Sequence, residues 1–328
     1  MAPDCRYPLA PNVPCPPAWP CLFEPTGPPM TPSAPVRIRR LPLGALALAT
    51  CALLLQACGG GGSSSTPDPV STLPSVSAAT ADRLSYGRPS TFTVTGTNLS
   101  TAVSYAATGC DGLTLLAGGS ATQQQFTCTP NQALSVGVAA STASGEIYRN
   151  TAQAVPKPQV TLTTSLGNVV IELEPAVVKV TVDNFLSYVK AGFYNGTIFH
   201  RVIRDFMVQG GGFTGQTATT LTAQTGIGAT IPLEIGRGLS NLRGTIAMAS
   251  TSSPNSAASE FFVNVVDNTF LDAPISSPPS PGYAVFGHVT SSNLAVIDVM
   301  KAVTTHTVGG YSNVPVTNIV LQTAAQTQ

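Results

Sequence analysis

One short segment of the chain gathers side chains that could hold and polarise a bound molecule. It spans residues 199–213 and reads FHRVIRDFMVQGGGF. Arg201 stands out within it, because a guanidinium keeps its charge and presents a fixed fork of hydrogen-bond donors. Such a cation could stabilise an atom that becomes electron-rich during a reaction. For an isolated arginine a surface salt bridge would be the favoured interpretation. The surrounding sequence must therefore show whether Arg201 has a catalytic role instead.

Several other chemistries lack the spacing that they need. The glycine run at 210–212 matches neither the GxxxxGK[ST] nor the GxGxxG pattern of phosphate-binding loops. His200, His288 and His306 lie far apart in the sequence and show no metal-ligand spacing. The GxSxG pattern of a nucleophile elbow is also missing. We therefore expect neither a metal nor a cofactor.

The composition argues against nucleic acid as a partner. Among 328 residues, 15 lysines and arginines balance 15 aspartates and glutamates, so the formal net charge is zero. Charged residues make up only 9% of the chain, whereas hydrophobic residues make up 43%. That proportion is enough for a real core, and the length allows about two domains.

The N-terminal residues 1–57 have the pattern of a leader. A basic patch at 37–40 precedes an apolar run at 41–55, too short for a comfortable membrane span of about 20 residues. The run ends in LQAC, which resembles a bacterial lipobox and implies acylation of Cys58. Stable anchoring takes two or more acyl chains. An ordinary signal peptide with a coincidental cysteine is the alternative, and Met30 is a candidate true start.

The residue after that cysteine bears on location. It is glycine rather than aspartate, and by resemblance to proteobacterial sorting this favours the outer membrane over the inner one. We expect a lipid-anchored periplasmic monomer. Residues 58–74, rich in glycine and serine, then form a flexible linker.

The segment 75–155 is expected to be a small β-sandwich-like domain. Short alternating runs rich in threonine, valine and aromatic residues are separated by glycine, asparagine and serine. Cys110 and Cys128 should pair in an oxidising compartment. A closed loop of about 18 residues would stabilise this domain by roughly 3 kcal/mol. The competing interpretation of the two cysteines is a pair of free thiols or a redox couple. For the segment as a whole, the expected function is that of a spacer.

The second half of the chain predicts many strands and two helices. Residues 160–174 have a hairpin pattern around a glycine turn, and 181–190 have helical spacing, with Thr181 as a candidate cap. A second helix is expected over 293–302, and 316–321 should be a closing strand. Such elements favour a closed β-barrel with helices over its open ends.

The segment 199–213 resembles the central motif of the cyclophilins, and the resemblance extends over about residues 159–323. Supporting blocks follow in the family's order: Asn184-Phe185, Gly192-Phe193-Tyr194, 244–249 (GTIAMA), Ser259-Glu260-Phe261-Phe262, Phe270-Leu271-Asp272 and Val285-Phe286-Gly287. The resemblance implies a mainly β, cyclophilin-like barrel capped by two helices. It also implies peptidyl-prolyl cis-trans isomerase activity on proline-containing polypeptides.

That reaction suits an arginine beside an apolar slot. Amide resonance sets a rotation barrier of about 18–20 kcal/mol, and in the twisted state the prolyl nitrogen gains a lone pair. A cation that donates hydrogen bonds there favours the twisted state selectively. By resemblance Arg201 is the catalytic arginine. Gln209 is expected either to donate hydrogen bonds to the substrate backbone or to orient Arg201. The slot that holds the proline ring is lined by Phe206, Met207, Phe262, Leu271 and Tyr283.

Several positions depart from the family's common pattern. Glu260 stands where a glutamine is usual, and it could pair with Arg201 or bind substrate backbone. Ser250 replaces an asparagine that meets the peptide. Phe270 replaces a frequent tryptophan at the binding site, which argues against tight cyclosporin binding. His200, also beside the substrate, should have a structural hydrogen bond, because the reaction transfers no proton.

We expect the protein to assist folding of secreted or envelope proteins, since proline isomerisation can limit folding rates. One alternative is a proline-peptide-binding or chaperone-like lipoprotein without useful turnover. Another is a structural envelope lipoprotein whose β-domain is the working part.

Overall fold

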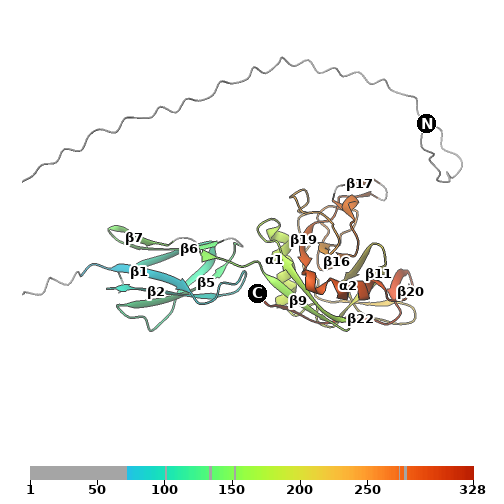
Figure 1. The fold of residues 1–328 in the computed structure, drawn as a ribbon, viewed down its shortest axis with the longest axis horizontal. Helices are drawn as coiled ribbons and strands as arrows, with labels where there is room; N and C mark the ends of the chain where they lie inside the picture. Colours follow the sequence, from blue (N-terminus) through green and yellow to red (C-terminus); the bar gives the residue numbers. More distant parts are fainter. Residues whose placement is uncertain (1–71, 100–101, 133–134, 151–152, 273, 277–278) are drawn as a thin grey trace, which may run out of the picture. The chain divides into compact units, whose positions relative to one another are not determined.

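The computed structural model describes residues 72–99, 102–132, 135–150, 153–272, 274–276 and 279–328. The leader at 1–57, the acylation of Cys58 and the start at Met30 therefore lie outside the described residues. All described residues belong to one compact unit, which is mainly β (Figure 1). In the described part of the chain, no helix combines the length and apolar character needed to cross a bilayer.

The first strands form a sandwich of two antiparallel sheets, as expected. One sheet has the order β1-β2-β5-β4, and the other has β3-β6-β7, with β8 paired to β6 (Figure 1). The strand bounds are β1 Ser75–Ala81, β2 Ser90–Thr97, β3 Ser104–Thr108, β4 Cys110–Leu115, β5 Gln123–Pro130, β6 Ser135–Thr142, β7 Gly145–Arg149 and β8 Gln153–Ala154.

Aromatic side chains and a disulfide hold this sandwich together. Phe92 and Phe126 are directly opposite on β2 and β5, fully buried, and stack with ring centroids 5.0 Å apart. Tyr105 from the other sheet packs on Phe126 at 5.9 Å, so the two layers share one core. Cys110 and Cys128 form the expected disulfide, which links the neighbouring strands β4 and β5.

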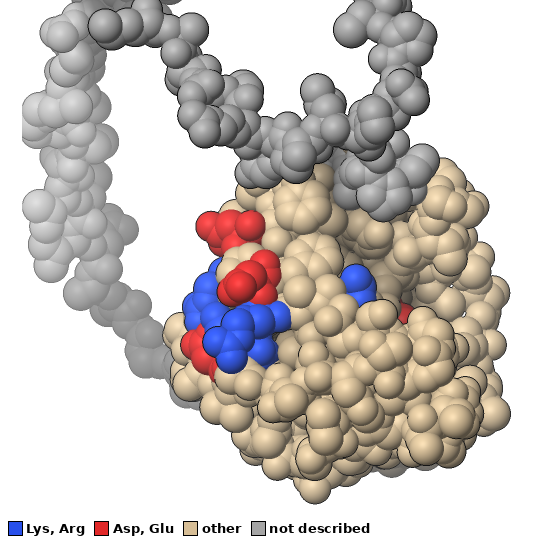
Figure 2. All heavy atoms as spheres, turned by 90° about the vertical axis from the view of Figure 1, so that its right-hand side faces the viewer, with Lys and Arg blue, Asp and Glu red and all other residues tan. Residues whose placement is uncertain are grey.

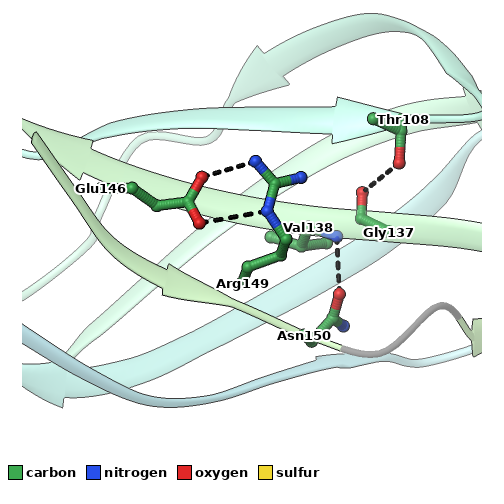
Figure 3. Close-up of polar contacts among 6 residues, drawn as sticks. All are labelled: Thr108, Gly137, Val138, Glu146, Arg149 and Asn150. Carbon is green, nitrogen blue, oxygen red and sulfur yellow. Dashed lines mark hydrogen bonds and ion pairs between the residues drawn. The ribbon is translucent and has the colours of Figure 1, made fainter.

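Polar side chains fasten the sheet of β3, β6 and β7 (Figure 3). Glu146 accepts two hydrogen bonds from Arg149 at 3.0 and 2.5 Å on the exposed β7. Just after β7, Asn150 Oδ1 accepts a 2.7 Å bond from the backbone N–H of Val138. Each of these contacts joins residues in or next to the same sheet, as Figure 3 shows.

Eight later strands close into a barrel, again as expected. Its order is β10-β19-β15-β16-β12-β11-β22-β9, with antiparallel pairing throughout. The bounds are β9 Gln159–Thr164, β10 Gly167–Leu173, β11 Thr197–Ile203, β12 Met207–Gly210, β15 Thr245–Met248, β16 Phe261–Asn264, β19 Val285–Val289 and β22 Ile319–Gln326. Strand β22 pairs with β9 and closes the ring, and both can be followed in Figure 1.

Three short hairpins and two 3-10 turns lie in the connections between the barrel elements. They were not expected from the sequence, because their strands are short and polar. Their bounds are β13 Phe213–Gln216, β14 Leu221–Ala223, β17 Ile275–Ser276, β18 Pro279–Ser280, β20 Thr305–Val308, β21 Tyr311–Pro315, η1 Thr269–Leu271 and η2 Ser291–Asn293.

Two helices pack against the barrel: α1, Lys179–Lys190, and α2, Leu294–Lys301. The expectation that Thr181 caps α1 is wrong, because the helix begins two residues earlier and its N-cap position, Val178, makes no side-chain cap. Thr181 is fully buried instead, and its N–H and hydroxyl both donate to the Glu234 carboxylate at 2.8 Å. A carboxylate from a distant loop therefore satisfies the helix start, where negative charge is favourable.

The barrel interior is an aromatic core. Phe185 of α1 contacts Tyr194, Phe261 and Phe286 with ring centroids 5.1–5.6 Å apart. Phe199 joins them through Phe261 at 6.0 Å. All five side chains are at most 2% exposed, so α1, three barrel strands and the turn that carries Tyr194 share one buried core.

Candidate active site

Strand register brings the candidate residues into one row on the outer face of the barrel. Arg201 on β11 is opposite Gln209 on β12, and Gln209 is opposite Phe262 on β16. Phe262 is in turn opposite Ala247 on β15. Residues paired across antiparallel strands share a face, so an arginine, an amide and an aromatic ring lie side by side over three strands.

An apolar slot lies along this row. It encloses about 150 Å³, room for a small ring but little more. Its lining residues are Arg201, Phe206, Met207, Gln209, Ala249, Ser250, Phe262, Leu271 and Tyr283. Every residue that the sequence assigned to the proline slot is therefore among them, and the arginine is at the same cavity.

The walls of the slot are firmly packed. Met207, Phe262 and Leu271 are 2–4% exposed and form a cluster with Ala247 and Val285. The ring of Tyr283 meets Phe262 edge-on at 5.6 Å. A slot with fixed walls can hold a ring while the attached chain rotates, because its shape does not follow the moving part.

Arg201 keeps most of its donors available to a ligand. Its Nη1 donates to Gln209 Oε1 at 3.2 Å. In the described part of the chain, no carboxylate oxygen lies within 4.0 Å of the guanidinium. Burial lowers the pKa of Arg201, and Tyr283 opposes that shift, but a guanidinium still remains protonated at neutral pH.

Glu260 contacts Gln209 rather than Arg201. Its Oε2 accepts a 2.8 Å hydrogen bond from Gln209 Nε2, so pairing with Arg201, one of the two alternatives for Glu260, is not what the structure has. The amide thus points its oxygen at the arginine and its nitrogen at the carboxylate. These contacts are those that Gln209 needs for one of its two expected roles, the orientation of Arg201.

His200 is a buried neighbour of this chain of contacts. Its Nε2 lies 3.5 Å from Glu260 Oε2, and its ring meets Phe213 edge-on at 4.6 Å. Burial, with a smaller contribution from the Arg201 charge, lowers the pKa of His200 to about 4. The ring is therefore neutral at physiological pH and does not cancel the charge of Glu260.

A network of buried asparagines lies behind the slot. Asn268 Nδ2 donates to the Phe206 carbonyl and to Asn264 Oδ1, both at 2.8 Å. Asn264 donates to Asn241 Oδ1 at 3.1 Å, and Asn241 Nδ2 reaches the Tyr283 carbonyl at 3.2 Å. All three asparagines are at most 2% exposed. They fix the backbone on two sides of the slot.

The glycine run at 210–212 serves close packing. Gly211 has φ +88°, and a Cβ there would lie 2.8 Å from the Ser259 carbonyl oxygen. A Cβ on Gly212 would overlap the Glu260 carboxylate. Side chains at these positions would push β12 from its neighbours, which explains the run without a phosphate.

Two other predicted binding residues lie at the rim. Ser250 lines the slot, and its buried Oγ has no hydrogen-bond partner within the described ranges of the chain. Phe270 is 59% exposed and is not among the lining residues; it stacks on Phe206 with ring centroids 5.9 Å apart. It would meet a substrate only outside the slot.

Sequence reasoning missed several residues near the arginine. Ala249 lines the slot, and the asparagine network supports it. Tyr311 and Asn313 of β21 flank a second hollow with Arg201 and Glu260. Of these residues, only Asn313 has a local sequence signal, because asparagine is a turn-forming residue and its φ is indeed positive, at 62°. The sequence cannot show that this turn lies beside the site.

One cluster on the barrel has metal-ligand types. Ligand atoms of Glu172, Glu174 and His288 lie within 4.8 Å of one another. Lys157 Nζ, however, already sits 2.7 Å from Glu174 Oε1 and 3.4 Å from Glu172 Oε1. The lysine supplies the countercharge, so the cluster is satisfied as an ion-pair network.

Comparison with known proteins gives a consistent result for the barrel. Residues 159–326 match the family described as cyclophilin type peptidyl-prolyl cis-trans isomerase/CLD. The chain is 47% identical to peptidyl-prolyl cis-trans isomerase cyp18 of Streptomyces antibioticus, over 50% of this chain and 96% of the relative. It is 49% identical to a peptidyl-prolyl cis-trans isomerase of Acinetobacter baylyi, over 50% of this chain and 82% of the relative.

A solved structure is also similar. It is a cyclophilin type peptidyl-prolyl cis-trans isomerase from Cryptosporidium parvum, with a TM-score of 0.42 and 22% sequence identity. The match covers 52% of this chain and 98% of that protein.

Proposed function

The chain belongs to the cyclophilin-type peptidyl-prolyl cis-trans isomerase family, and we propose that it uses Arg201 and the adjoining slot to speed folding of proteins outside the cytoplasm. It is an enzyme for rotation about the bond that precedes proline. The identity of its clients and the roles of individual residues are the proposal's own content.

The proposed mechanism uses shape and one cation. The proline ring enters the slot and is held against Phe262 and Met207, while the preceding carbonyl turns outside it. In the half-turned state the prolyl nitrogen becomes pyramidal and offers a lone pair. Arg201 donates to that nitrogen, and because the lone pair exists only in the twisted state, the bond lowers the barrier. No proton is transferred.

The observation that carries this proposal is the orientation of Arg201. Among the described residues, its one side-chain hydrogen bond goes to Gln209, a neutral amide, and its guanidinium lines the apolar slot. A guanidinium engaged by a carboxylate would have spent its donors on that partner. Here one donor is given to Gln209, and the guanidinium lies at the wall of the cavity where a proline would lie.

The test is the relaxation of a short Xaa–Pro peptide after a solvent jump. We expect the full mature chain to accelerate relaxation, and Arg201→Ala to lose about 10²–10³ of that acceleration. Arg204→Ala is the matched control, because Arg204 is an exposed arginine in the turn after the same strand. Equal rates for the intact enzyme and Arg201→Ala would contradict the mechanism.

The alternative of a peptide binder without turnover loses its main support. Its best support was the departure from the family's pattern at Glu260, and Glu260 contacts Gln209 rather than the arginine. Binding of the peptide by a chain that leaves its relaxation rate unchanged would nevertheless revive it.

The proposed location rests on the leader pattern alone. The LQAC sequence ending at Cys58 resembles a lipobox, and an acylated cysteine would tether the barrel through the glycine- and serine-rich linker. We expect Cys58→Ala to abolish lipid labelling in a bacterial host and to move the protein from the membrane fraction to the soluble one. Unchanged labelling would exclude Cys58 as the anchor.

A further inference from the structure

Glu260 is a carboxylate set in a hollow next to the proline slot. This hollow, which we call the serine hollow, encloses about 320 Å³, roughly twice the slot. Its walls include Ile227, Ser250, Thr251, Ser256, Ser259 and Glu260. Glu260 is the one charged residue among its described lining residues.

The charge of Glu260 is not cancelled by its surroundings. In the part of the chain that the structure describes, no lysine or arginine nitrogen lies within 4.0 Å of its carboxylate. His200 is the nearest basic group, and its lowered pKa leaves it neutral at physiological pH. Figure 2 shows most of the visible charged side chains gathered at the left of the face that it draws; apart from them, an isolated basic group lies near a small acidic spot in a hollow.

The carboxylate is only partly open to solvent, since 34% of the Glu260 side chain is exposed. Burial raises the pKa of Glu260, and the hydrogen bond from Gln209 only partly opposes this. Glu260 Oε1 lies so close to Gly212 that a side chain there would overlap it. An ionised group held in this way gains more from an incoming cation than a fully hydrated one would.

The serine hollow adjoins the slot. Gln209, Ala249 and Ser250 line both cavities. The Ser250 hydroxyl on this shared wall is buried and has no hydrogen-bond partner among the described residues, so it can take a hydrogen bond from a peptide backbone crossing the wall. A polypeptide whose proline occupies the slot would then place a nearby side chain in the hollow.

The hollow suits a long side chain with a positive end. Ile227 is 50% exposed at its edge, and lysine or arginine can lay its methylene groups along such a surface while its charged end reaches a carboxylate. An acidic side chain would meet repulsion from Glu260, and a short one would leave the carboxylate unpaired.

We propose that Glu260 is a specificity-determining residue that makes the enzyme prefer substrates with lysine or arginine close to the proline. The cationic end pairs with the Glu260 carboxylate, while the rest of the side chain occupies the serine hollow. This inference rests on the proposed function, because it requires the proline to occupy the adjoining slot.

The experiment compares kcat/KM for peptides that carry lysine, glutamine or glutamate at each of three positions before and two after the proline. We expect lysine to exceed glutamine by about tenfold at one position, as a partly desolvated ion pair can supply. Glu260→Gln should reduce that ratio to about one. Asp205→Asn is the control, because it removes an exposed carboxylate from the turn between β11 and β12 and should leave the ratio unchanged.

The outcomes separate the two claims. If the glutamine peptides are isomerised but lysine has no advantage at any position, the specificity inference fails while the proposed function stands. A lysine advantage that persists in Glu260→Gln also overturns the inference. If the enzyme accelerates none of the peptides, the proposed function itself fails.

Discussion

The two sides of the same barrel strands have opposite characters. On the inner side of β16, Phe261 meets Phe185 and Tyr194 through ring contacts in the buried core. On the outer side, the next residue, Phe262, lies in a row with Gln209 and Arg201 beside an open slot. Buried residues of the two faces fall into separate clusters. Because side chains alternate along a strand, one short segment can stabilise the fold and form the site independently.

Truncation of the two neighbouring phenylalanines, one on each face of β16, should have the largest effect and tests whether the faces act independently. Phe261→Ala should cost about 3–5 kcal/mol of unfolding free energy, because it leaves a cavity in a closed core. Phe262→Ala should cost only about 1.5–3 kcal/mol, since its side is already open to the slot. Urea unfolding checks both values.

Activity should reverse that order. Folded Phe262→Ala should lose about tenfold or more in kcat/KM because a wall of the slot is gone, whereas Phe261→Ala should keep near-normal turnover per folded molecule. Similar losses of both stability and activity in the two variants would mean that the faces are not independent.

The pH dependence of stability tests the polar side of β11. His200 has a folded-state pKa of about 4, below its unfolded value of about 6.5. Between these values the unfolded chain binds the extra proton, so stability is full above about pH 6.5 and falls as the pH drops toward 4. The loss should reach about 3 kcal/mol.

Comparison with His200→Gln isolates this contribution. Glu260, whose pKa is raised, titrates with the opposite sign and is retained in both proteins. We expect urea unfolding between pH 4 and 7 to show a shallower slope for His200→Gln. Parallel slopes would show that His200 is not held neutral by the fold.

A smaller loss of stability should follow from a change in the network of buried asparagines behind the slot. Asn268→Ala leaves Asn264 Oδ1 without its donor and removes one of the two donors of the Phe206 carbonyl, which keeps its bond from the Val265 N–H. The change should cost about 1–3 kcal/mol of unfolding free energy. Because Phe206 lines the slot, KM should rise as well. Asn195→Ala is a suitable control, since Asn195 is exposed and accepts a hydrogen bond from the Ala324 N–H away from the slot. A loss of stability with unchanged KM would confine the network to a structural role.

The sequence predicted the parts of the molecule that repeat or alternate. The hairpin expected at 160–174 corresponds to β9 and β10, because two alternating runs flank a glycine turn there. The slot residues followed from the family resemblance. Thr181 misled because its hydroxyl suits a helix cap, while the true partner of the helix start is Glu234, a residue 53 positions away.

Other features could not be read from local patterns. The asparagine network joins residues 241, 264 and 268 through side chains in a strand and loops, where polar residues have no periodicity. The hairpin of β20 and β21 lies at a hollow that Arg201 also lines, and its Tyr311 ring meets Phe213 at 5.3 Å. Glu260 was recognised as unusual, but only the structure distinguishes its contact with Gln209 from one with Arg201.

The most direct measurement of the central claim separates binding from rotation on the enzyme. Exchange spectroscopy of a Xaa–Pro peptide, with the enzyme at varied concentration, gives the peptide Kd and the rate of cis/trans interconversion in the bound state. The account predicts that Arg201→Ala keeps the Kd within about threefold but slows bound-state interconversion by about 10²-fold or more. Undiminished interconversion in the Arg201→Ala complex would contradict it.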